Sequence, residues 1–456
     1  MPFRVRERGR AMKSARSIRG LAWIDGFVRN IRPHVFVRRR DSLLILMPNQ
    51  AYHLNRTGVY LLSRTLAGEP ISRVLGRAIA KQDQTDERVQ EVNDFFCDVR
   101  ALVMGCLCEG QGRRAVEQVP FRRSGSILPV LSEIAVTYRC NLECRFCYAG
   151  CSCAKKPDSA EMTAAEVEVV LRRIRNEAEV PSVSFTGGEP TIREDLPRLI
   201  RSAVRIGLRV NLITNGTLLT DSLARELKRA GLMSAQVSIE APTAEVHDGL
   251  TGAPGSFERT VCGIEALKGR GIYVHTHTTI NRVNARHVGD MPALAKSLGL
   301  QRLSMNMVMP CGTAGTGETA LRYGDVGDLV RLVKRRARDA GVEFMWYSPT
   351  PYCVFNPIAA GLGGKACAAC DGLLSVASNG DVLPCSSLAD PVGNLLDQSF
   401  DGVWNSDRAL YYRNREYVPA ECRSCGRLEL CSGACPIYWG AFGCEELVGA
   451  STEAIE

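Results

Sequence analysis

Three cysteines near residue 140 have a spacing that suits an iron–sulfur cluster. Cys140, Cys144 and Cys147 follow one another at intervals of four and three in the segment CNLECRFC. Cysteine thiolates hold iron–sulfur clusters, and a cubane with only three protein ligands keeps one iron open to a further ligand. A structural zinc site is the alternative, although short zinc motifs normally complete four ligands in closed pairs. Cys151 and Cys153 keep that alternative open.

A second group of cysteines lies in the last quarter of the chain. The 456 residues include 19 cysteines, an odd total that does not suit a simple disulfide framework. The group contains Cys367, Cys370, Cys385, Cys422, Cys425, Cys431, Cys435 and Cys444. Metal binding explains such a density better than disulfide bonds do. Two zinc knuckles alone would leave too many of these thiols without a role. Metal clusters would also stabilise this segment, whose regular apolar periodicity fades.

The elements that must position these cysteines are strands and helices in alternation. Strands are expected over residues 133–138, 181–187, 208–214, 234–240, 272–280 and 301–308, with amphipathic helices between them. The helix of residues 163–178 opens with a capping box formed by Thr163 and Glu166. Six such units predict a parallel, curved sheet, an α/β partial (β/α)6 TIM-like barrel with its chemistry at the carboxyl ends of the strands.

The remaining segments divide the chain into further parts. Residues 1–30 are expected to form a basic, flexible extension, and residues 31–110 a small winged-helix-like domain of short strands followed by helices at 55–66, 70–82 and 86–107. Asn55 is the expected cap of the first of these helices. A linker at 111–128 precedes the barrel at 129–348, the cysteine-rich iron–sulfur domain at 349–447 and a tail at 448–456.

Composition excludes several other classes of protein. No apolar run approaches the roughly 20 residues of a membrane helix, and the N-terminus has no apolar signal segment, so we expect a cytoplasmic protein without membrane contact. The net charge of +8 reflects a basic N-terminal arm. That arm lacks the interleaved aromatic residues that stack on bases, so nucleic acid is not an expected partner.

The segment CNLECRFCY resembles the CxxxCxxC signature of radical S-adenosylmethionine (SAM) enzymes, with Tyr148 where that family carries an aromatic residue. The resemblance implies that Cys140, Cys144 and Cys147 hold a [4Fe-4S] cluster whose open iron chelates SAM. One electron then cleaves SAM to a 5′-deoxyadenosyl radical, which abstracts hydrogen from the substrate. A flavodoxin- or ferredoxin-type protein is the expected electron donor.

Further motifs match positions where members of that family contact SAM. TGGEP resembles the family's GGEP motif, and a glycine-rich turn allows close backbone approach. The resemblance implies SAM contacts for Gly187, Gly188, Glu189, Pro190, Asn215, Ser238 and Glu240. Loop capping is the alternative role for the last three, and Asn281 and Asn284 are additional candidates. His275, His277 and Glu318 are candidates for the substrate cavity, with core or loop roles as the alternative.

The C-terminal cysteines resemble the SPASM domain pattern CX9-15GX4C, CX2CX5CX3C and a final Cys. By position, the resemblance implies two auxiliary [4Fe-4S] clusters, one held by Cys367, Cys370, Cys385 and Cys435, the other by Cys422, Cys425, Cys431 and Cys444. Either Cys367 or Cys370 could open the pattern, and if one of them is free the first cluster has an open iron. Cys311 and Cys353 have no assignment, whereas Cys97, Cys106, Cys108 and Cys262 are expected in the core.

Three segments before the barrel resemble the peptide chaperones of pyrroloquinoline quinone biosynthesis, which are RiPP recognition elements. They are HVFVR, the following LLILMPNQAYHLNRTGVYLLSRTLAGEPISRVL, and NDFFCDVRALVMG. Members of that family hold a leader peptide by strand addition. A peptide-modifying enzyme acting on a ribosomally made precursor is therefore the leading hypothesis. A maturase of a folded protein partner or of a tetrapyrrole is the alternative, and an electron-transfer module would leave TGGEP and the barrel unexplained.

Overall fold

The computed structural model describes residues 20–47, 50–78, 86–104, 116–119, 128–151, 161–316 and 319–448. The chain divides into two compact units, unit 1 from Met1 to Ile127 and unit 2 from Leu128 to Glu456. Each unit has its own hydrophobic core. Cys106, Cys108, Cys153 and Glu318, which the sequence analysis named, lie outside the described residues.

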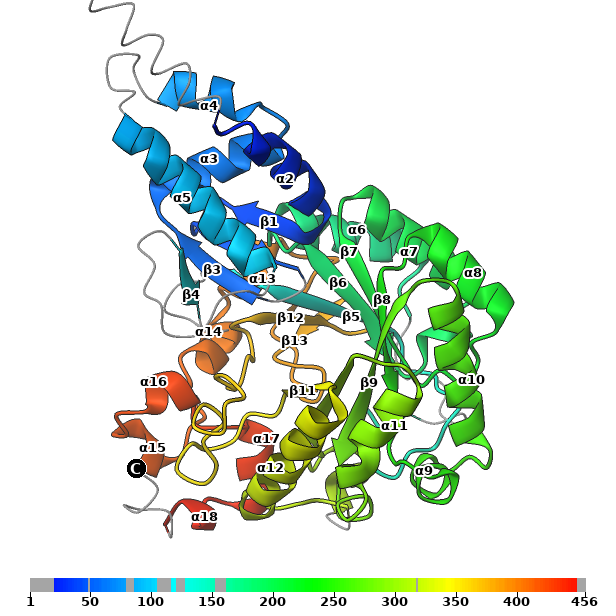
Figure 1. Ribbon diagram of the computed structural model, residues 1–456. Coiled ribbons are helices and arrows are strands. Elements are labelled where there is room, and N and C mark those ends of the chain that lie inside the picture. Colours follow the sequence, from blue (N-terminus) through cyan, green and yellow to red (C-terminus); the bar gives the residue numbers. More distant parts are fainter. Residues whose placement is uncertain are drawn as a thin grey trace, which may run out of the picture. The chain divides into compact units, whose positions relative to one another are not determined.

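Unit 1 combines a four-stranded antiparallel sheet with helices, as the sequence predicts for a winged-helix-like domain (Figure 1). The strands, in spatial order, are β1 (Val35–Arg38), β2 (Leu43–Leu46), β3 (Gln50–Leu54) and β4 (Val116–Val119). The helices are α2 (Trp23–Ile31), the 3-10 turn η1 (Arg32–His34), α3 (Arg56–Leu66), α4 (Ile71–Ala78) and α5 (Asp86–Val103). The Asn55 side chain accepts the Gly58 N–H, which confirms the predicted cap of α3.

Two boundaries differ from those predicted. Residues 1–30 were expected to form an extension, yet Trp23–Ile31 form α2, because Ile24, Val28 and Ile31 make a buried apolar stripe on one helix face. The expected linker of residues 111–128 contains β4, which pairs with β3 in the sheet of unit 1. Both elements depend on contacts with residues far away in the sequence. The polar composition of the two segments does not indicate those contacts.

Unit 2 is built on one curved sheet of ten strands in the order β11-β10-β9-β8-β7-β6-β5-β12-β13-β14. The strands are β5 (Leu131–Thr137), β6 (Ser182–Gly187), β7 (Arg209–Thr214), β8 (Ser234–Ser238), β9 (Tyr273–Ile280), β10 (Arg302–Met307), β11 (Glu343–Trp346), β12 (Leu373–Val376), β13 (Asp381–Leu383) and β14 (Gly393–Asn394). β5 to β10 pair in parallel and confirm the six predicted strands. The sheet continues with β11 on one side and with β12 of the cysteine-rich segment on the other.

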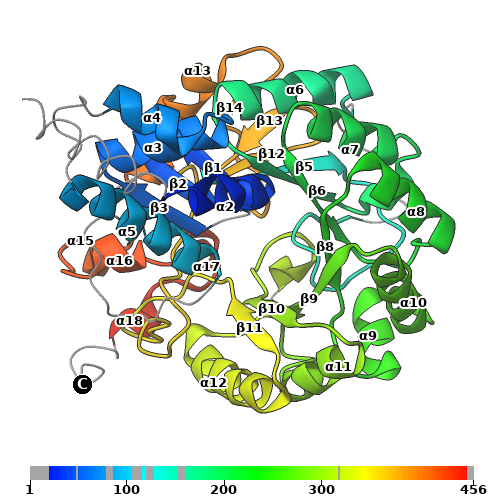
Figure 2. The same cartoon turned by 45° about the horizontal axis from the view of Figure 1, so that its top comes forward.

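Helices cover the outside of the curved sheet, as Figure 2 shows for α6 to α12. They are α6 (Ala164–Asn176), α7 (Leu196–Arg205), α8 (Asp221–Ala230), α9 (Ala244–Thr251), α10 (Ser256–Gly269), α11 (Met291–Ser297) and α12 (Tyr323–Ala340), with 3-10 turns η3 (Pro190–Ile192), η4 (Val288–Asp290) and η5 (Gly312–Thr316). The capping box of Thr163 and Glu166 is present at the start of α6. Sequence periodicity did not predict α9, which has only eight residues.

The cysteine-rich segment after β11 contains β12 to β14 and short helices. These helices are α13 (Phe400–Trp404), α14 (Asp407–Arg413), α15 (Ala420–Arg423), α16 (Leu428–Cys431), α17 (Pro436–Phe442) and α18 (Glu445–Val448). Cys422 and Cys431 lie in α15 and α16, and Cys435 immediately precedes α17. Helices this short need tertiary support, because helix nucleation is unfavourable in isolation.

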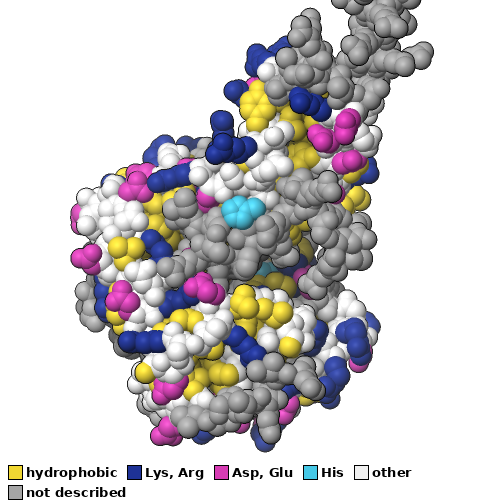
Figure 3. Space-filling view, turned by 90° about the vertical axis from the view of Figure 1, so that its left-hand side faces the viewer, with side chains coloured by type: hydrophobic (Ala, Val, Ile, Leu, Met, Phe, Trp, Pro, Cys, Tyr) yellow, Lys and Arg dark blue, Asp and Glu magenta, His cyan; other side chains and the backbone are white. Residues whose placement is uncertain are grey.

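Charged side chains of both signs are spread over the described surface. On the face in Figure 3, Lys and Arg side chains are interspersed with Asp and Glu side chains, and the described residues form no continuous basic area there. None of the helices described is long and apolar enough to cross a membrane.

Cys262 was expected in the core, yet it is exposed because it lies on the outer face of α10. Cys97 is half-buried.

Candidate functional site

The loop that carries Cys140, Cys144 and Cys147 begins directly after β5 and is held from two sides. Its Glu143 and Arg145 amides donate to the carbonyls of Thr251 and Leu250 at the end of α9, each over 3.0 Å. From the opposite side, the segment after β10 contacts the loop through Thr313. The Thr313 hydroxyl accepts the Cys147 N–H over 2.8 Å and donates to the Cys144 carbonyl over 2.9 Å.

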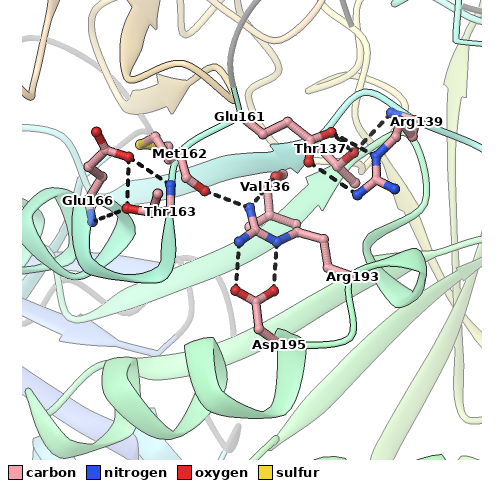
Figure 4. Close-up of polar contacts among 9 residues, drawn as sticks. All are labelled: Val136, Thr137, Arg139, Glu161, Met162, Thr163, Glu166, Arg193 and Asp195. Carbon is pink, nitrogen blue, oxygen red and sulfur yellow. Dashed lines mark hydrogen bonds and ion pairs between the residues drawn. The ribbon is translucent and has the colours of Figure 1, made fainter. Parts of the chain in front are cut away.

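A network of charged side chains fixes the end of β5, from which that loop starts (Figure 4). The Arg193 guanidinium donates to the Val136 and Met162 carbonyls, each over 2.9 Å, and forms a bidentate pair with Asp195. The Glu161 carboxylate accepts from the Thr137 hydroxyl and pairs with Arg139 at 3.1 Å. Planar bidentate pairs of this kind restrict orientation as well as adding energy. The strand end is therefore held rigidly where the cysteine loop begins.

The two glycines of TGGEP are required by the close approach of this turn to the cysteine loop. The Gly188 and Glu189 amides donate to the Thr137 and Arg139 carbonyls over 2.8 and 2.9 Å. A Cβ atom on Gly188 would stand 2.2 Å from the Arg139 carbonyl oxygen. Only glycine permits this contact, so the predicted position of the turn beside the cysteine loop has a steric explanation.

The Glu189 carboxylate is fully buried and accepts hydrogen bonds from the protein itself. One oxygen accepts from the Thr191 amide and from the Thr191 and Thr214 hydroxyls, and the other accepts the Asn215 N–H over 2.7 Å. Burial raises the pKa of Glu189, while these donors lower it. The carboxylate thus joins the turn after β6 to the end of β7, a role that the sequence did not reveal.

Asn215, a predicted SAM contact, lies beside the cysteine loop. Its side-chain amide donates to Asn141 over 2.9 Å and lies 4.0 Å from the Cys140 sulfur. Its amide oxygen accepts from the Thr217 hydroxyl, which in turn accepts from the Asn141 amide over 2.8 Å. Three side chains that follow β5 and β7 therefore form one closed ring of hydrogen bonds next to Cys140.

Ser238 is the last residue of β8, and Glu240 follows that strand. The Glu240 carboxylate accepts the Thr279 N–H over 2.8 Å, and burial raises its pKa to about 8. Its backbone amide donates to Nδ1 of the buried His247 over 3.1 Å. The buried Asn284 amide donates to the Glu240 and Thr279 carbonyls, so its side chain joins the loops after β8 and β9. Asn281 accepts from the Val283 and Asn284 amides.

The thiols of the cysteine loop influence one another electrostatically. Burial raises the pKa of Cys144 well above its usual value, and Glu240 adds to this. A hydrogen bond from the Cys151 thiol lowers the pKa of Cys147, and the Cys151 amide lies 3.4 Å from the Cys147 sulfur. Burial also raises the pKa of Tyr148 well above its usual value. Cys151 thus belongs to the same local group of thiols.

The donors of this loop are thiols. Cys140, Cys144 and Cys147 lie in one short segment, and the Cys151 amide donates to the Cys147 sulfur. Cysteine thiolates are the ligands of iron–sulfur clusters, and three of them would leave one iron open. Among the described residues, no three Cys, His, Asp or Glu side chains are arranged to hold a single metal ion.

The first expected auxiliary set is brought together in the fold. Burial, followed by Cys367 and Cys435, raises the pKa of Cys385 well above its usual value. Burial and then Cys367 raise the pKa of Cys435 to about 12. Burial raises the pKa of Cys370 to about 12, with a smaller contribution from Cys367. Cys311 acts on Cys435, and Cys147 acts on Cys311, so Cys311 lies between this set and the cysteine loop.

The second expected set is grouped less evenly. Burial raises the pKa of Cys422 to about 12, and the neighbouring thiols that add to this are, in decreasing order, Cys431, Cys353, Cys425 and Cys444. For Cys444, Glu421 is the only group besides burial that raises the pKa. Cys353, which had no predicted role, is therefore one of the thiols near Cys422.

His275 and His277 lie in β9, on alternate residues, so they share one face of the strand. His275 Nε2 lies 3.2 Å from the Gln236 amide oxygen, and His277 Nδ1 lies 2.9 Å from the Ser304 hydroxyl. Burial lowers the pKa of His275 to about 3 and that of His277 to about 4. Both imidazoles are therefore neutral near pH 7.

Sequence reasoning missed the contacts of Thr313 and Gly312 with the cysteine loop. A Cβ atom on Gly312 would stand 2.2 Å from the Cys147 carbonyl oxygen and 2.4 Å from that of Tyr148. Glycine and threonine in a loop are common, and nothing local marks them as neighbours of a segment 166 residues away. Only the fold brings them there.

Comparison with protein families identifies two domains in the chain. The model of the radical SAM superfamily matches residues 134–295, and the model of the SPASM iron–sulfur cluster-binding domain matches residues 367–426. An AdoMet-dependent heme synthase of Oleidesulfovibrio alaskensis is 30% identical over 323 residues, covering 65% of this chain and 80% of that protein. A PqqA peptide cyclase of Gluconobacter oxydans is 29% identical over 318 residues, covering 67% and 86%.

Solved structures share the fold, and SuiB shares it over more of the chain than the curated relatives do. SuiB of Streptococcus suis bound to its precursor peptide SuiA superposes with a TM-score of 0.64 at 18% identity, covering 91% of this chain and 99% of SuiB. The anSMEcpe structure with bound AdoMet gives a TM-score of 0.54 at 20% identity and covers 67% of this chain and 89% of that protein.

Proposed function

This chain belongs to the radical SAM superfamily and carries a SPASM domain, and we propose that it modifies a ribosomally made precursor peptide held by unit 1. It is an enzyme that uses SAM and iron–sulfur clusters. The bound cluster and SAM supply a 5′-deoxyadenosyl radical that abstracts hydrogen. The chain's own residues have to bind the cofactors, orient the peptide and exclude water.

Specific residues are assigned to these tasks. Cys140, Cys144 and Cys147 would hold the SAM-binding cluster, and the turn at Gly187 and Gly188 would face the methionine part of SAM. The auxiliary clusters would take an electron from the oxidised substrate. A crosslink or a related oxidative change at a C–H bond is the expected product, and a flavodoxin or ferredoxin is the expected donor.

The observation that carries the peptide proposal is the separate fold of unit 1. Unit 2 contains 329 of the 456 residues, so a structural match covering 91% of the chain must extend into unit 1. SuiB, the protein in that match, was solved with a precursor peptide. The curated relatives, by contrast, match 65% to 72% of this chain.

Strand β1 offers an edge to which a peptide could add. Among the described residues, β1 pairs only with β2. The Met47 amide donates to the His34 carbonyl over 2.9 Å, so by alternation Phe36 directs its main chain toward β2 and Val37 directs its main chain to the outer edge. Strand addition at such an edge would depend on the Val37 N–H and carbonyl. The opposite side of β3 is covered by β4.

A proline at Val37 tests this directly. Val37→Pro removes the outward N–H while an edge strand tolerates proline, and Val37→Ala is the matched control that keeps the N–H. The full chain is titrated with fluorescent peptides translated from short reading frames beside the gene. We expect Val37→Ala to bind as the unchanged protein does and Val37→Pro to bind at least 10-fold more weakly.

Two other outcomes carry information. Equal binding by Val37→Pro would move the peptide to the edge of β3, where it would have to displace β4. Failure of every such peptide to bind the unchanged chain would contradict the peptide proposal.

Mass spectrometry of a co-expressed peptide decides the function. For each crosslink we expect the peptide to lose about 2 hydrogen masses, or to show a similar oxidative shift.

The radical chemistry is tested without knowledge of the substrate. Combined Cys140→Ala, Cys144→Ala and Cys147→Ala should abolish dithionite-driven cleavage of SAM to 5′-deoxyadenosine. The same protein should keep about two thirds of its iron, because two of three [4Fe-4S] clusters would be intact. Cleavage at the original rate would contradict the assignment of these cysteines.

A tetrapyrrole substrate is the second candidate, and the identity to heme synthases favours it. The O. alaskensis protein and a Methanosarcina barkeri heme synthase, 28% identical, are as similar to this chain as the peptide cyclases are. This candidate predicts that the reduced enzyme binds porphyrin precursors with a shift of their absorbance band. SAM cleavage stimulated by a tetrapyrrole and not by any peptide would decide for it.

A further inference from the structure

The inner face of the curved sheet is polar around β9. Val274 of β9, Leu303 of β10 and Trp346 of β11 belong to the core that packs beneath the outer helices (Figure 2). Side chains alternate along a strand, so His277 and Ser304 lie on the opposite, inner face. Barrel interiors are usually filled by branched apolar side chains. An imidazole and a hydroxyl at this place therefore indicate a role in chemistry rather than in packing.

His277 lies at the level of the predicted SAM contacts. The register of β8 and β9 places Ser238 beside His277, and the register of β7 and β8, continued by one residue, places Asn215 beside Ser238. Neighbouring strands are about 4.8 Å apart, so two strand spacings, about 10 Å, separate His277 from Asn215. The Asn215 side-chain amide lies 4.0 Å from the Cys140 sulfur. His277 therefore belongs to the row of side chains that begins next to the cysteine loop.

Hydrogen bonds determine which ring nitrogen of His277 carries the proton. The Ser304 hydroxyl donates to the Thr276 carbonyl over 3.1 Å and lies 2.9 Å from His277 Nδ1. A hydroxyl has one proton, so both contacts are satisfied only if the Nδ1–H of His277 donates to the Ser304 oxygen. Nε2 of His277 is then the nitrogen with the free electron pair.

The surroundings of His277 keep its ring neutral. The Tyr347 ring stacks on it, with 5.9 Å between ring centroids and 18° between planes. Burial lowers the pKa of His277 to about 4, and the Asn306 side chain opposes this. The titratable neighbours on the inner face are Tyr347 and His275, two residues along β9, whereas β8 and β10 place serine hydroxyls beside the ring. At pH 7 the ring can therefore accept a proton.

We propose that Nε2 of His277 accepts the proton that the substrate peptide loses when its radical is oxidised, an inference that rests on the proposed function. One peptide C–H gives its hydrogen atom to the 5′-deoxyadenosyl radical, which becomes 5′-deoxyadenosine. The carbon radical then bonds to a second peptide atom, whose bond to hydrogen breaks. The proton of that bond goes to His277 and one electron goes to an auxiliary cluster, so atoms and electrons balance.

The tautomer of His277 is measured without any substrate. The chain has six histidines, so the holoenzyme labelled with ¹⁵N-histidine gives few imidazole signals by NMR. His277→Ala identifies the signals of His277 by their loss. At pH 7 we expect a protonated Nδ1 and an unprotonated Nε2. A protonated Nε2 would overturn the proposal, because that nitrogen could not accept a proton.

The proton transfer is tested with a neighbouring peptide that the unchanged enzyme modifies. His277→Ala should form about 100-fold less product per 5′-deoxyadenosine, because general bases contribute on this order. Added imidazole should restore product in this variant, whereas triazole, a ring of the same size that is much less basic, should not. A residue that only fills space would be replaced equally well by either ring. Equal rescue by both rings, or full product in His277→Ala, would overturn the proposal.

Two further variants complete the experiment. His277→Asn serves if His277→Ala does not fold: its side-chain N–H can still donate to Ser304, but it has no basic nitrogen and should lose product to the same extent. His287→Ala, in the turn before η4, is the matched control and should keep the ratio of product to 5′-deoxyadenosine. Absence of modified peptide with the unchanged enzyme would contradict the proposed function, and this inference with it. Normal product in both His277 variants would contradict this inference alone.

Discussion

The Cys147 backbone amide donates a hydrogen bond to the Thr313 hydroxyl over 2.8 Å, across 166 residues of sequence. The Thr313 amide returns a bond to the Cys147 carbonyl over 2.9 Å. The carboxyl end of β10 is thereby fastened to the loop that starts at the end of β5. The segments that follow β5 and β10 thus meet at Cys147, one of the three cysteines proposed to hold the SAM-binding cluster.

Loss of the Thr313 hydroxyl should loosen that loop. Each hydrogen bond contributes about 1 kcal/mol net, and Thr313→Ala removes the bonds to Cys147 and Cys144. We expect iron to leave the SAM-binding cluster about 5- to 10-fold faster in the presence of a chelator. Thr313→Ser keeps the hydroxyl and should lose iron at the original rate. Equal rates for the alanine and serine variants would contradict this role.

Gly312 should tolerate substitution even less. Its φ is +60°, and an added Cβ would stand 2.2 Å from the Cys147 carbonyl oxygen. A strained backbone of this kind costs about 1 to 3 kcal/mol before the clash is counted. Gly312→Ala should therefore reduce SAM cleavage and iron content together. Gly315→Ala in the same turn, where a Cβ meets nothing within 4 Å, is the matched control and should behave as the unchanged enzyme. Similar losses in both variants would disprove the steric argument.

The Glu189 carboxylate should not be replaceable by an amide. Each of its oxygens accepts one main-chain N–H, from Thr191 or from Asn215. In Glu189→Gln, the side-chain NH2 must face one of these donors, whichever way the amide turns. A buried N–H without an acceptor costs about 1 to 3 kcal/mol. Thermal unfolding should show this loss together with weaker SAM binding, whereas Glu194→Gln, exposed in the same turn, should show neither.

Local signals explain which parts of this structure could be predicted. Apolar alternation predicted β5 to β10, and the pair Thr163 and Glu166 predicted the start of α6. The spacing of Cys140, Cys144 and Cys147 predicts a cluster loop after β5, because the three cysteines are close in sequence. These features are encoded within a few residues.

Features that depend on long-range contacts were not predicted. The burial of α2 against the core of unit 1 and the pairing of β4 with β3 join residues far apart in the chain. The same holds for Thr313 at the cysteine loop and for the turn at Tyr352 beside Cys431.

The stability of unit 2 should fall in acid because His247 is buried in its neutral form. Its Nδ1 accepts the Glu240 N–H over 3.1 Å, so protonation there would break that bond. Burial lowers the pKa of His247 to about 4, against an opposing effect of Asp248. An unfolded histidine has a pKa of about 6.5. Between these two values the unfolded chain binds one more proton, so the free energy of unfolding decreases as the pH falls through this window.

His247→Asn isolates this contribution, because Asn Oδ1 can accept the Glu240 N–H and does not titrate. From pH 7.5 to pH 5.0, the unchanged protein should lose about 2 kcal/mol more stability than His247→Asn. His275 and His277 also titrate in acid, but they are present in both proteins and cancel in the difference. Anaerobic urea unfolding, followed by far-UV circular dichroism at several pH values, measures it. Parallel curves for the two proteins would show that His247 does not make unit 2 sensitive to acid.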